Sequence, residues 1–171
     1  MERKRFEGAP CSIARSVDIL GDWWAPLIIR EALYGTRRFD AFQRWLGIGR
    51  NILTKRLSQL VEQGVLERVR YQEKPERFEY RLTEKGNDAA QVLIAMMPFG
   101  ERWQFEPGHE PIRLFDRRTG DRVHPMLVDA ETGEPIDVEN LFPGPGPAFP
   151  ADESIRRERF AEYYRRSVDE A

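Results

Sequence analysis

The stretch LGIGRNILTKRLSQLVEQG, residues 46–64, decides the fold of this chain. Leu53, Leu57 and Leu60 recur at the i, i+4, i+7 spacing that places side chains on one face of an α-helix. Gly64 is suited to end that helix. The other side carries hydrogen-bond donors, namely Arg50, Asn51, Thr54, Lys55 and Ser58. The stretch therefore predicts an amphipathic helix with a buried leucine face and an exposed polar face.

The overall composition indicates a globular protein. The chain has 171 residues, 40% hydrophobic and 33% charged, with a formal net charge of −2. Since apolar runs stay well short of the ~18 residues of a membrane span, we expect no membrane association. The N-terminus lacks the apolar region of a secretory signal, and a single cysteine excludes an internal disulfide framework. We therefore expect a cytoplasmic protein.

Positive charge is concentrated in one part of the chain. Residues 36–81 contain eleven Lys and Arg against six Asp and Glu, although the whole chain is slightly acidic. Such asymmetry indicates a surface for a polyanion carried on an acidic body. A solvated charged face is the other reading of this pattern.

The order of expected elements predicts the fold class. Helical spacing recurs over 12–24, 25–35 and 36–47, where Thr36 is a suitable N-cap, and again in the opening stretch. Residues 65–72 and 77–83 read as two strands joined by a charged turn. A long helix follows over 83–103, which Pro98 is expected to kink or end. This order predicts a winged helix-turn-helix, a mainly α fold with small β elements.

Three basic segments match the way winged helix-turn-helix folds dock on DNA. They are the helix within 46–64, the charged turn with Lys74 and Arg77, and the start of the helix over 36–47. In such folds the N-terminal end of one helix, the recognition helix, meets the bases, where Arg suits guanine and Asn suits adenine. In this chain it is the helix within residues 46–64. We expect Arg50, Asn51 and Thr54 to read bases. Lys55 and the strand pair are expected to bind the phosphate backbone of the DNA. The full set of predicted DNA contacts is Arg37, Arg38, Gly49, Arg50, Asn51, Thr54, Lys55, Ser58, Lys74 and Arg77.

Two other functions remain to be weighed. Hydrolase, P-loop and dinucleotide motifs are missing from the sequence, as are paired histidine–carboxylate clusters, so we do not expect an enzyme. A winged helix that binds a partner protein without specific DNA binding is the alternative. The outward cations argue against it, because a protein-binding module need not keep them.

Several short motifs along 11–103 are those of a known family. They are Gly35, Arg38 and Phe39; Leu53 and Thr54; Pro75, Arg77, Glu79 and Tyr80; and Leu82, Thr83 and Gly86. With them the segment resembles the HxlR-type winged-helix transcriptional regulators. The resemblance implies a homodimer on an inverted-repeat operator, and we expect a repressor that responds to a small molecule or a redox signal.

The resemblance also implies where the dimer forms and where a signal is sensed. The interface would use the first helix and the helix after the wing, with Ile13, Val17, Val92, Leu93, Met96 and Met97. For the residues of the helix after the wing, the alternative is packing on the chain's own core. Cys11 occupies the position of a sensor cysteine, or is a small buried residue at a helix start. Trp23 and Trp24 belong to the core, or one of them lines an effector pocket.

The remaining chain is expected to form an extension. We divide the sequence into a basic arm (1–10), the winged helix-turn-helix (11–104), β-hairpins (105–139), a Pro/Gly linker (140–152) and a C-terminal helix (153–171). An Asp-x-x-Thr-Gly turn at Asp116 repeats at Asp129. In longer relatives this region resembles a zinc ribbon, but the required cysteines are absent here. We therefore expect no metal and no cofactor.

Overall fold

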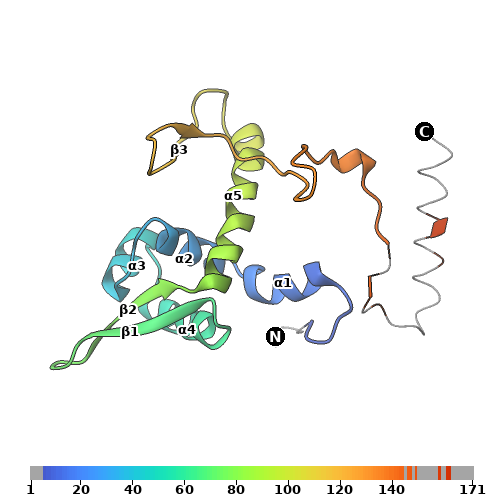
Figure 1. Ribbon diagram of the computed structural model, residues 1–171. Coiled ribbons are helices and arrows are strands. Elements are labelled where there is room, and N and C mark those ends of the chain that lie inside the picture. Colours follow the sequence, from blue (N-terminus) through green and yellow to red (C-terminus); the bar gives the residue numbers. More distant parts are fainter. Residues whose placement is uncertain (1–5, 145, 148, 150–157, 159–160, 163–171) are drawn as a thin grey trace. The chain divides into compact units, whose positions relative to one another are not determined.

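The computed structural model describes residues 6–144, 146–147, 149, 158 and 161–162 (Figure 1). The described part contains five α-helices and two small antiparallel sheets, which confirms the predicted mainly α fold with small β elements. The elements are α1 (Ser12–Leu20), α2 (Trp24–Leu33), α3 (Phe39–Leu46), α4 (Arg50–Glu62), β1 (Leu66–Gln72), β2 (Arg77–Leu82), α5 (Glu84–Gln104), β3 (Leu114–Phe115), β4 (Arg122–Val123) and the 3₁₀ turn η1 (Val138–Asn140).

The chain forms two compact units. The first comprises Met1–Glu7 and Ile13–Pro125, and the second comprises Gly8–Ser12 and Met126–Ala171. The predicted functional residues, apart from Cys11, belong to the first unit. Of the linker expected over 140–152, residues 140–144, 146–147 and 149 are described. The C-terminal helix expected over 153–171 lies largely outside the described residues; 158, 161 and 162 are described and are helical.

The core of the first unit is built around the leucine face of α4. Leu53, Leu57 and Leu60 are buried as predicted, against side chains of α2, α3 and the segment that enters β1. The buried set is Ala25, Ile28, Ile29, Ala32, Phe42, Ile48, Leu53, Leu57, Leu60, Val65, Leu66 and Ala90. This packing fixes which side of α4 remains exposed.

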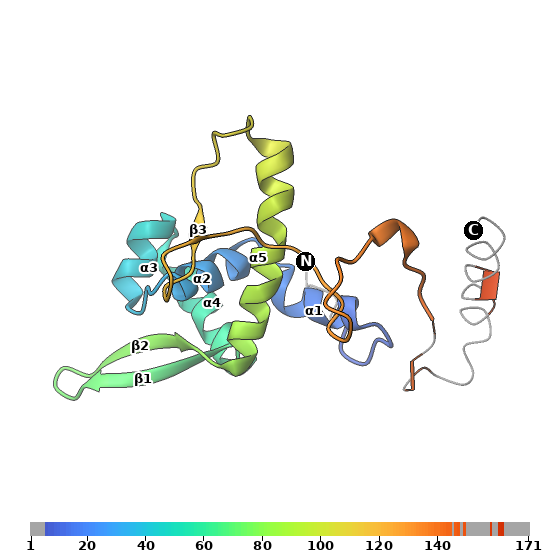
Figure 2. The same ribbon diagram turned by 45° about the horizontal axis from the view of Figure 1, so that its top comes forward.

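Strands β1 and β2 form the wing, residues 66–82, which extends away from the helices in both views (Figures 1 and 2). The two strands are antiparallel, with Leu66 opposite Leu82 and Arg70 opposite Phe78. A bridge between Arg38 and Glu79 joins the segment before α3 to the wing. The N-terminus of α3 is therefore held beside the wing.

The start of α3 differs from the prediction. Arg38, in extended conformation, occupies the N-cap, and Thr36 does not. The Thr36 hydroxyl donates instead to the Glu31 carboxylate at 3.3 Å. The expected cap was therefore wrong, because the side chain is already engaged by α2.

Hydrogen bonds connect the start of α5 to the residues that follow α4. The Thr83 hydroxyl donates to the carbonyl oxygen of Gly64 at 2.6 Å and accepts from the Gly86 N–H at 3.1 Å. The Lys85 ammonium donates to the Gln63 carbonyl at 2.8 Å. These contacts satisfy carbonyls that a helix end leaves without partners.

The sequence predicts that Pro98 kinks or ends this helix; α5 runs past Pro98 to Gln104, so Pro98 does not end it. One proline removes a single intrahelical hydrogen bond, and the remaining ones continue the helix on either side.

The two Asp-x-x-Thr-Gly turns are built by the same hydrogen bonds. In the first, the Asp116 carboxylate accepts the N–H groups of Arg118 and Thr119. In the second, the N–H groups of Thr132 and Glu131 bind the Asp129 carboxylate and hold its pKa below the usual value. The first turn joins β3 to β4, and the second is closed by a Val128–Pro135 bridge.

Candidate nucleic-acid interface

The exposed face of α4 carries the predicted base-reading side chains. Arg50, Asn51, Thr54, Lys55 and Ser58 are all exposed. The helix starts after Gly49, which as N-cap has no side chain to cover the first-turn N–H groups. Those groups and the helix dipole favour an anion at this end. The tight entry is made by Gly47, in the left-handed region at φ 62°, and by buried Ile48.

Two exposed arginines lie against aromatic rings, Arg50 at the start of α4 and Arg38 at the N-cap of α3. The Arg50 guanidinium carbon is 5.2 Å from the centroid of the Phe39 ring. That of Arg38 is 4.8 Å from the centroid of the Tyr71 ring. Both arginines are exposed, and neither has a carboxylate partner among the described residues. Their positive charge therefore remains available to a polyanion.

Arg37 is directed elsewhere. Its guanidinium donates to the Ala32 carbonyl near the end of α2, and its own carbonyl accepts the Tyr80 N–H at 2.7 Å. The side chain is half-buried. Of the two neighbouring arginines, only Arg38 is exposed. Arg37 instead connects α2 to the wing.

The tip of the wing presents two cations without acidic partners in the described part of the chain, Lys74 and Arg77, both exposed. Arg70, by contrast, lies 3.5 Å from the Glu76 carboxylate and 4.0 Å from that of Glu73. These exposed pairs partly offset the Arg70 charge. The wing therefore offers Lys74 and Arg77 to a partner.

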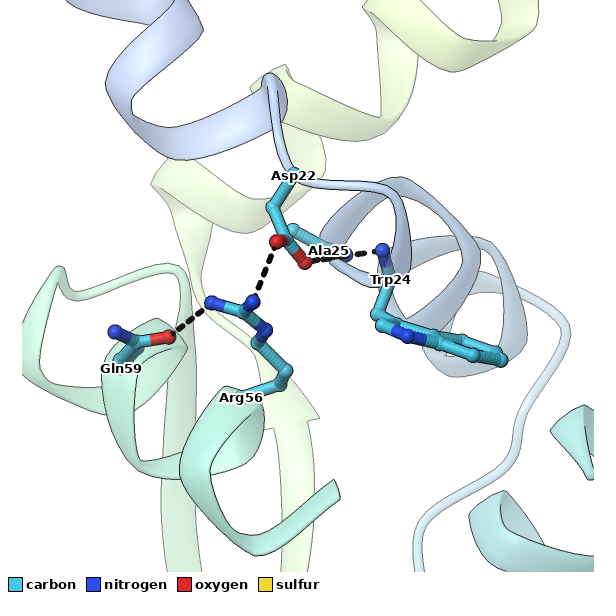
Figure 3. Close-up of polar contacts among 5 residues, drawn as sticks. All are labelled: Asp22, Trp24, Ala25, Arg56 and Gln59. Atoms are coloured by element: carbon cyan, nitrogen blue, oxygen red, sulfur yellow. Dashed lines mark hydrogen bonds and ion pairs between the residues drawn. The ribbon is translucent and has the colours of Figure 1, made fainter. Parts of the chain in front are cut away.

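Arg56 shows that cations on α4 have different roles (Figure 3). Its guanidinium forms an ion pair with the Asp22 carboxylate at 2.7 Å and donates to the Gln59 side-chain oxygen at 2.8 Å. The other Asp22 oxygen accepts the N–H groups of Trp24 and Ala25 at the start of α2. Arg56 is therefore a structural tie between α4 and α2.

Helix α5 exposes an apolar stripe that the sequence revealed only in part. Val92 and Met96 are 48% and 58% exposed, and Phe99 and Trp103 continue the stripe at 66% and 62%. These four residues share one helical face. Leu93 instead packs on the core and Met97 is half-buried. On α1, Ile13 and Val17 are also exposed.

The two tryptophans have different environments. Trp24 packs against the core as expected. Trp23 is 90% exposed, so its expected place in the core was wrong. Trp23 is the N-cap of α2, so it precedes the helical residues whose side chains pack on the core.

Cys11, the other candidate sensor residue, is exposed, so the alternative of a buried structural cysteine is overturned.

Within the described ranges, no group of three His, Cys, Asp or Glu side chains is arranged to hold a metal ion. No helix there is long and apolar enough to cross a membrane.

Comparison with known proteins agrees with this geometry. The family model HxlR-like helix-turn-helix matches residues 19–107. An uncharacterized HTH-type transcriptional regulator of Mycobacterium tuberculosis is 42% identical over 147 residues, 86% of this chain and 92% of that protein.

Two solved structures are also similar. The crystal structure of PA1607, a candidate transcription factor, has a TM-score of 0.74 and 36% identity, covering 84% of this chain and all of that one. PA1374 from Pseudomonas aeruginosa, a candidate transcription factor, has a TM-score of 0.59 and 40% identity, covering 87% and 99%. These likenesses extend beyond the segment that the family model matches.

Proposed function

Because the chain belongs to the HxlR-like helix-turn-helix family of transcriptional regulators, we propose that it binds an inverted-repeat operator as a homodimer, with sequence specificity. The exposed face of α4 carries this proposal. It presents Arg50, Asn51 and Thr54 at an uncovered helix N-terminus, and the leucine face behind them is buried. The relatives bear the name of regulators and not of enzymes.

Different side chains would read bases and hold the backbone. Arg50 can bind guanine through two hydrogen bonds, and Asn51 can bind adenine. Arg38, Lys55, Lys74 and Arg77 would neutralise phosphates on either side. Arg37 supports this surface from behind through its contact with Ala32. Thr54 donates to the Arg50 carbonyl at 2.9 Å, which leaves its oxygen free to accept.

A dimer would cover the apolar stripe of α5. Four large side chains on one helical face, each about half exposed, are costly to leave in water. A second copy of the chain offers the same stripe, as a two-fold interface requires. Ile13 and Val17 of α1 extend the apolar surface available to it.

We further propose that the protein is a repressor whose operator affinity changes with a small-molecule or redox signal. Cys11 is exposed and therefore accessible to an oxidant or electrophile. Exposed Trp23 is the candidate contact for a small molecule. Treatment with a mild oxidant, compared between the wild type and Cys11→Ser, tests the first of these routes.

Selection of bound duplexes from a random pool tests the DNA-binding proposal. We expect enrichment of a palindromic sequence with half-sites about 10 bp apart or a multiple of that spacing. A pool that stays random after repeated rounds would refute specific binding and would favour a protein partner for the winged helix.

A further inference from the structure

The aromatic contact of Arg50 is distinct from the contacts of several other arginines in the first unit. Arg30, Arg56, Arg70 and Arg81 each lie within 4.0 Å of a carboxylate oxygen. A carboxylate fixes an arginine but cancels its charge. The ring of Phe39 also fixes the side chain of Arg50, and it leaves the charge and the N–H groups of the guanidinium edge available.

Phe39 is well placed to hold another side chain. It is the first residue of α3, half-buried and packed against the core. Its backbone is therefore held by the helix and its ring by the core. Arg50 begins α4, just beyond the turn of Gly47 to Gly49. The ring and the guanidinium thus meet where the N-termini of both helices face the proposed DNA.

We infer that Phe39 is a positioning residue for DNA recognition, which holds Arg50 in the orientation that reads a base. The inference rests on the proposed function, since it concerns how the same surface works. Free arginine side chains lose conformational entropy on binding. Stacking on Phe39 reduces that loss before DNA arrives, and so raises affinity and base discrimination together.

Tyr71 does the same for Arg38 on the wing side. Arg38 is the N-cap of α3, and its backbone bridges to Glu79. A phosphate, unlike a base edge, accepts donors from many directions. Loss of the Tyr71 ring should therefore weaken binding to all duplexes alike, whereas loss of the Phe39 ring should act at one base position.

A double-mutant cycle between Phe39→Leu and Arg50→Ala tests the inference. Operator affinity is measured for the wild type, both single variants and the double variant, on the selected operator and on duplexes with one base pair changed. We expect Phe39→Leu to weaken operator binding about two- to fivefold and to reduce discrimination at one position. It should have no further effect when Arg50 has already been replaced by alanine. Phe39→Tyr, which keeps the ring, should bind as the wild type does.

A control variant separates positioning from packing. Phe42 lies on the same helix, is fully buried, and stacks edge-on against Tyr80 with the centroids 6.4 Å apart. Phe42→Leu should lower the melting temperature, and its effect on affinity should be the same in the wild-type and the Arg50→Ala backgrounds. Equal losses from Phe39→Leu in the two backgrounds would overturn the inference.

A second measurement needs neither a variant nor DNA. Protons next to the Arg50 guanidinium should resonate upfield in the NMR spectrum of the free wild-type protein, because the guanidinium carbon lies over the Phe39 ring. Arg77, exposed on the wing, is the reference. Unshifted Arg50 protons would overturn the inference even if the chain binds its operator. A wild type without sequence preference would instead refute the proposed function, whatever the NMR result.

Discussion

Asp22 and Arg56 form an ion pair of 2.7 Å between the start of α2 and the middle of α4 (Figure 3). Their side chains are 16% and 27% exposed, so water screens the pair only partly. Asp22 also accepts two N–H groups at the N-terminus of α2. One carboxylate thus starts a helix and anchors the recognition helix against it.

The neighbours Lys55 and Arg56 should therefore respond differently to alanine. Arg56→Ala leaves a half-buried Asp22 without its cation and should cost about 1–3 kcal/mol of unfolding free energy. Lys55→Ala should change stability by less than about 0.5 kcal/mol and lower DNA affinity. Urea denaturation measures the first effect and duplex titration the second. Equal stability losses from the two substitutions would contradict the roles assigned here.

Gly86 should not tolerate a side chain. A Cβ atom at this position would lie 2.2 Å from the carbonyl oxygen of Val65, which is backbone and cannot easily move. We expect Gly86→Ala to destabilise the protein by about 1–3 kcal/mol, although alanine is the better helix former.

Gly100 is the matched control on the same helix, because a Cβ there would meet nothing within 4 Å. Gly100→Ala should leave stability unchanged or raise it by up to about 1 kcal/mol. Thermal unfolding of both variants compares them directly. A Gly86→Ala protein as stable as the wild type would show that α5 does not need this close approach to Val65.

Arg50 and Lys74 should differ in what they contribute to DNA binding. Arg50→Ala should cost about 1–3 kcal/mol on the operator and relax discrimination at one base position. Lys74→Ala should weaken operator and random duplexes by the same factor and reduce the salt slope by about 2, because a dimer loses one phosphate contact in each subunit. Titrations on single-substitution duplexes make the distinction. Unchanged operator affinity in Arg50→Ala would remove it from the base-reading set.

The apolar stripe of α5 should control the oligomeric state. Met96→Glu places a charge in the middle of the proposed interface, where its desolvation is costly, and should shift the protein towards monomer. Gln91→Glu adds the same charge on the same helix, away from the stripe, and should not. Sedimentation velocity over a range of protein concentrations measures both. A Met96→Glu protein that remains dimeric would place the interface elsewhere.

Local patterns predicted the helices and the wing because each depends on neighbouring residues. The spacing of Leu53, Leu57 and Leu60 was sufficient to orient α4, and it therefore identified the exposed face as well. The repeated Asp-x-x-Thr-Gly turn was likewise correct, since an aspartate and its neighbouring N–H groups determine it.

Contacts between residues distant in sequence could not be predicted from local patterns. Helical spacing placed Lys55 on the predicted polar face and left Arg56 out of it. The partner of Arg56 is Asp22, from the start of another helix, and only the fold brings the two together. Thr36 satisfied a capping preference but bonded to Glu31 of the preceding helix. The exposure of Trp23 depends on how α2 packs, which its own residue type does not indicate.

The salt dependence of duplex binding tests the central claim most directly. A dimer that places Arg38, Lys55, Lys74 and Arg77 of each subunit on phosphates should lose about 10⁴-fold in operator affinity between about 50 and 200 mM salt. It should still prefer the operator to a scrambled duplex of the same length at both concentrations. Weak binding that varies little with salt and does not distinguish the two duplexes would contradict the claim that this winged helix reads DNA.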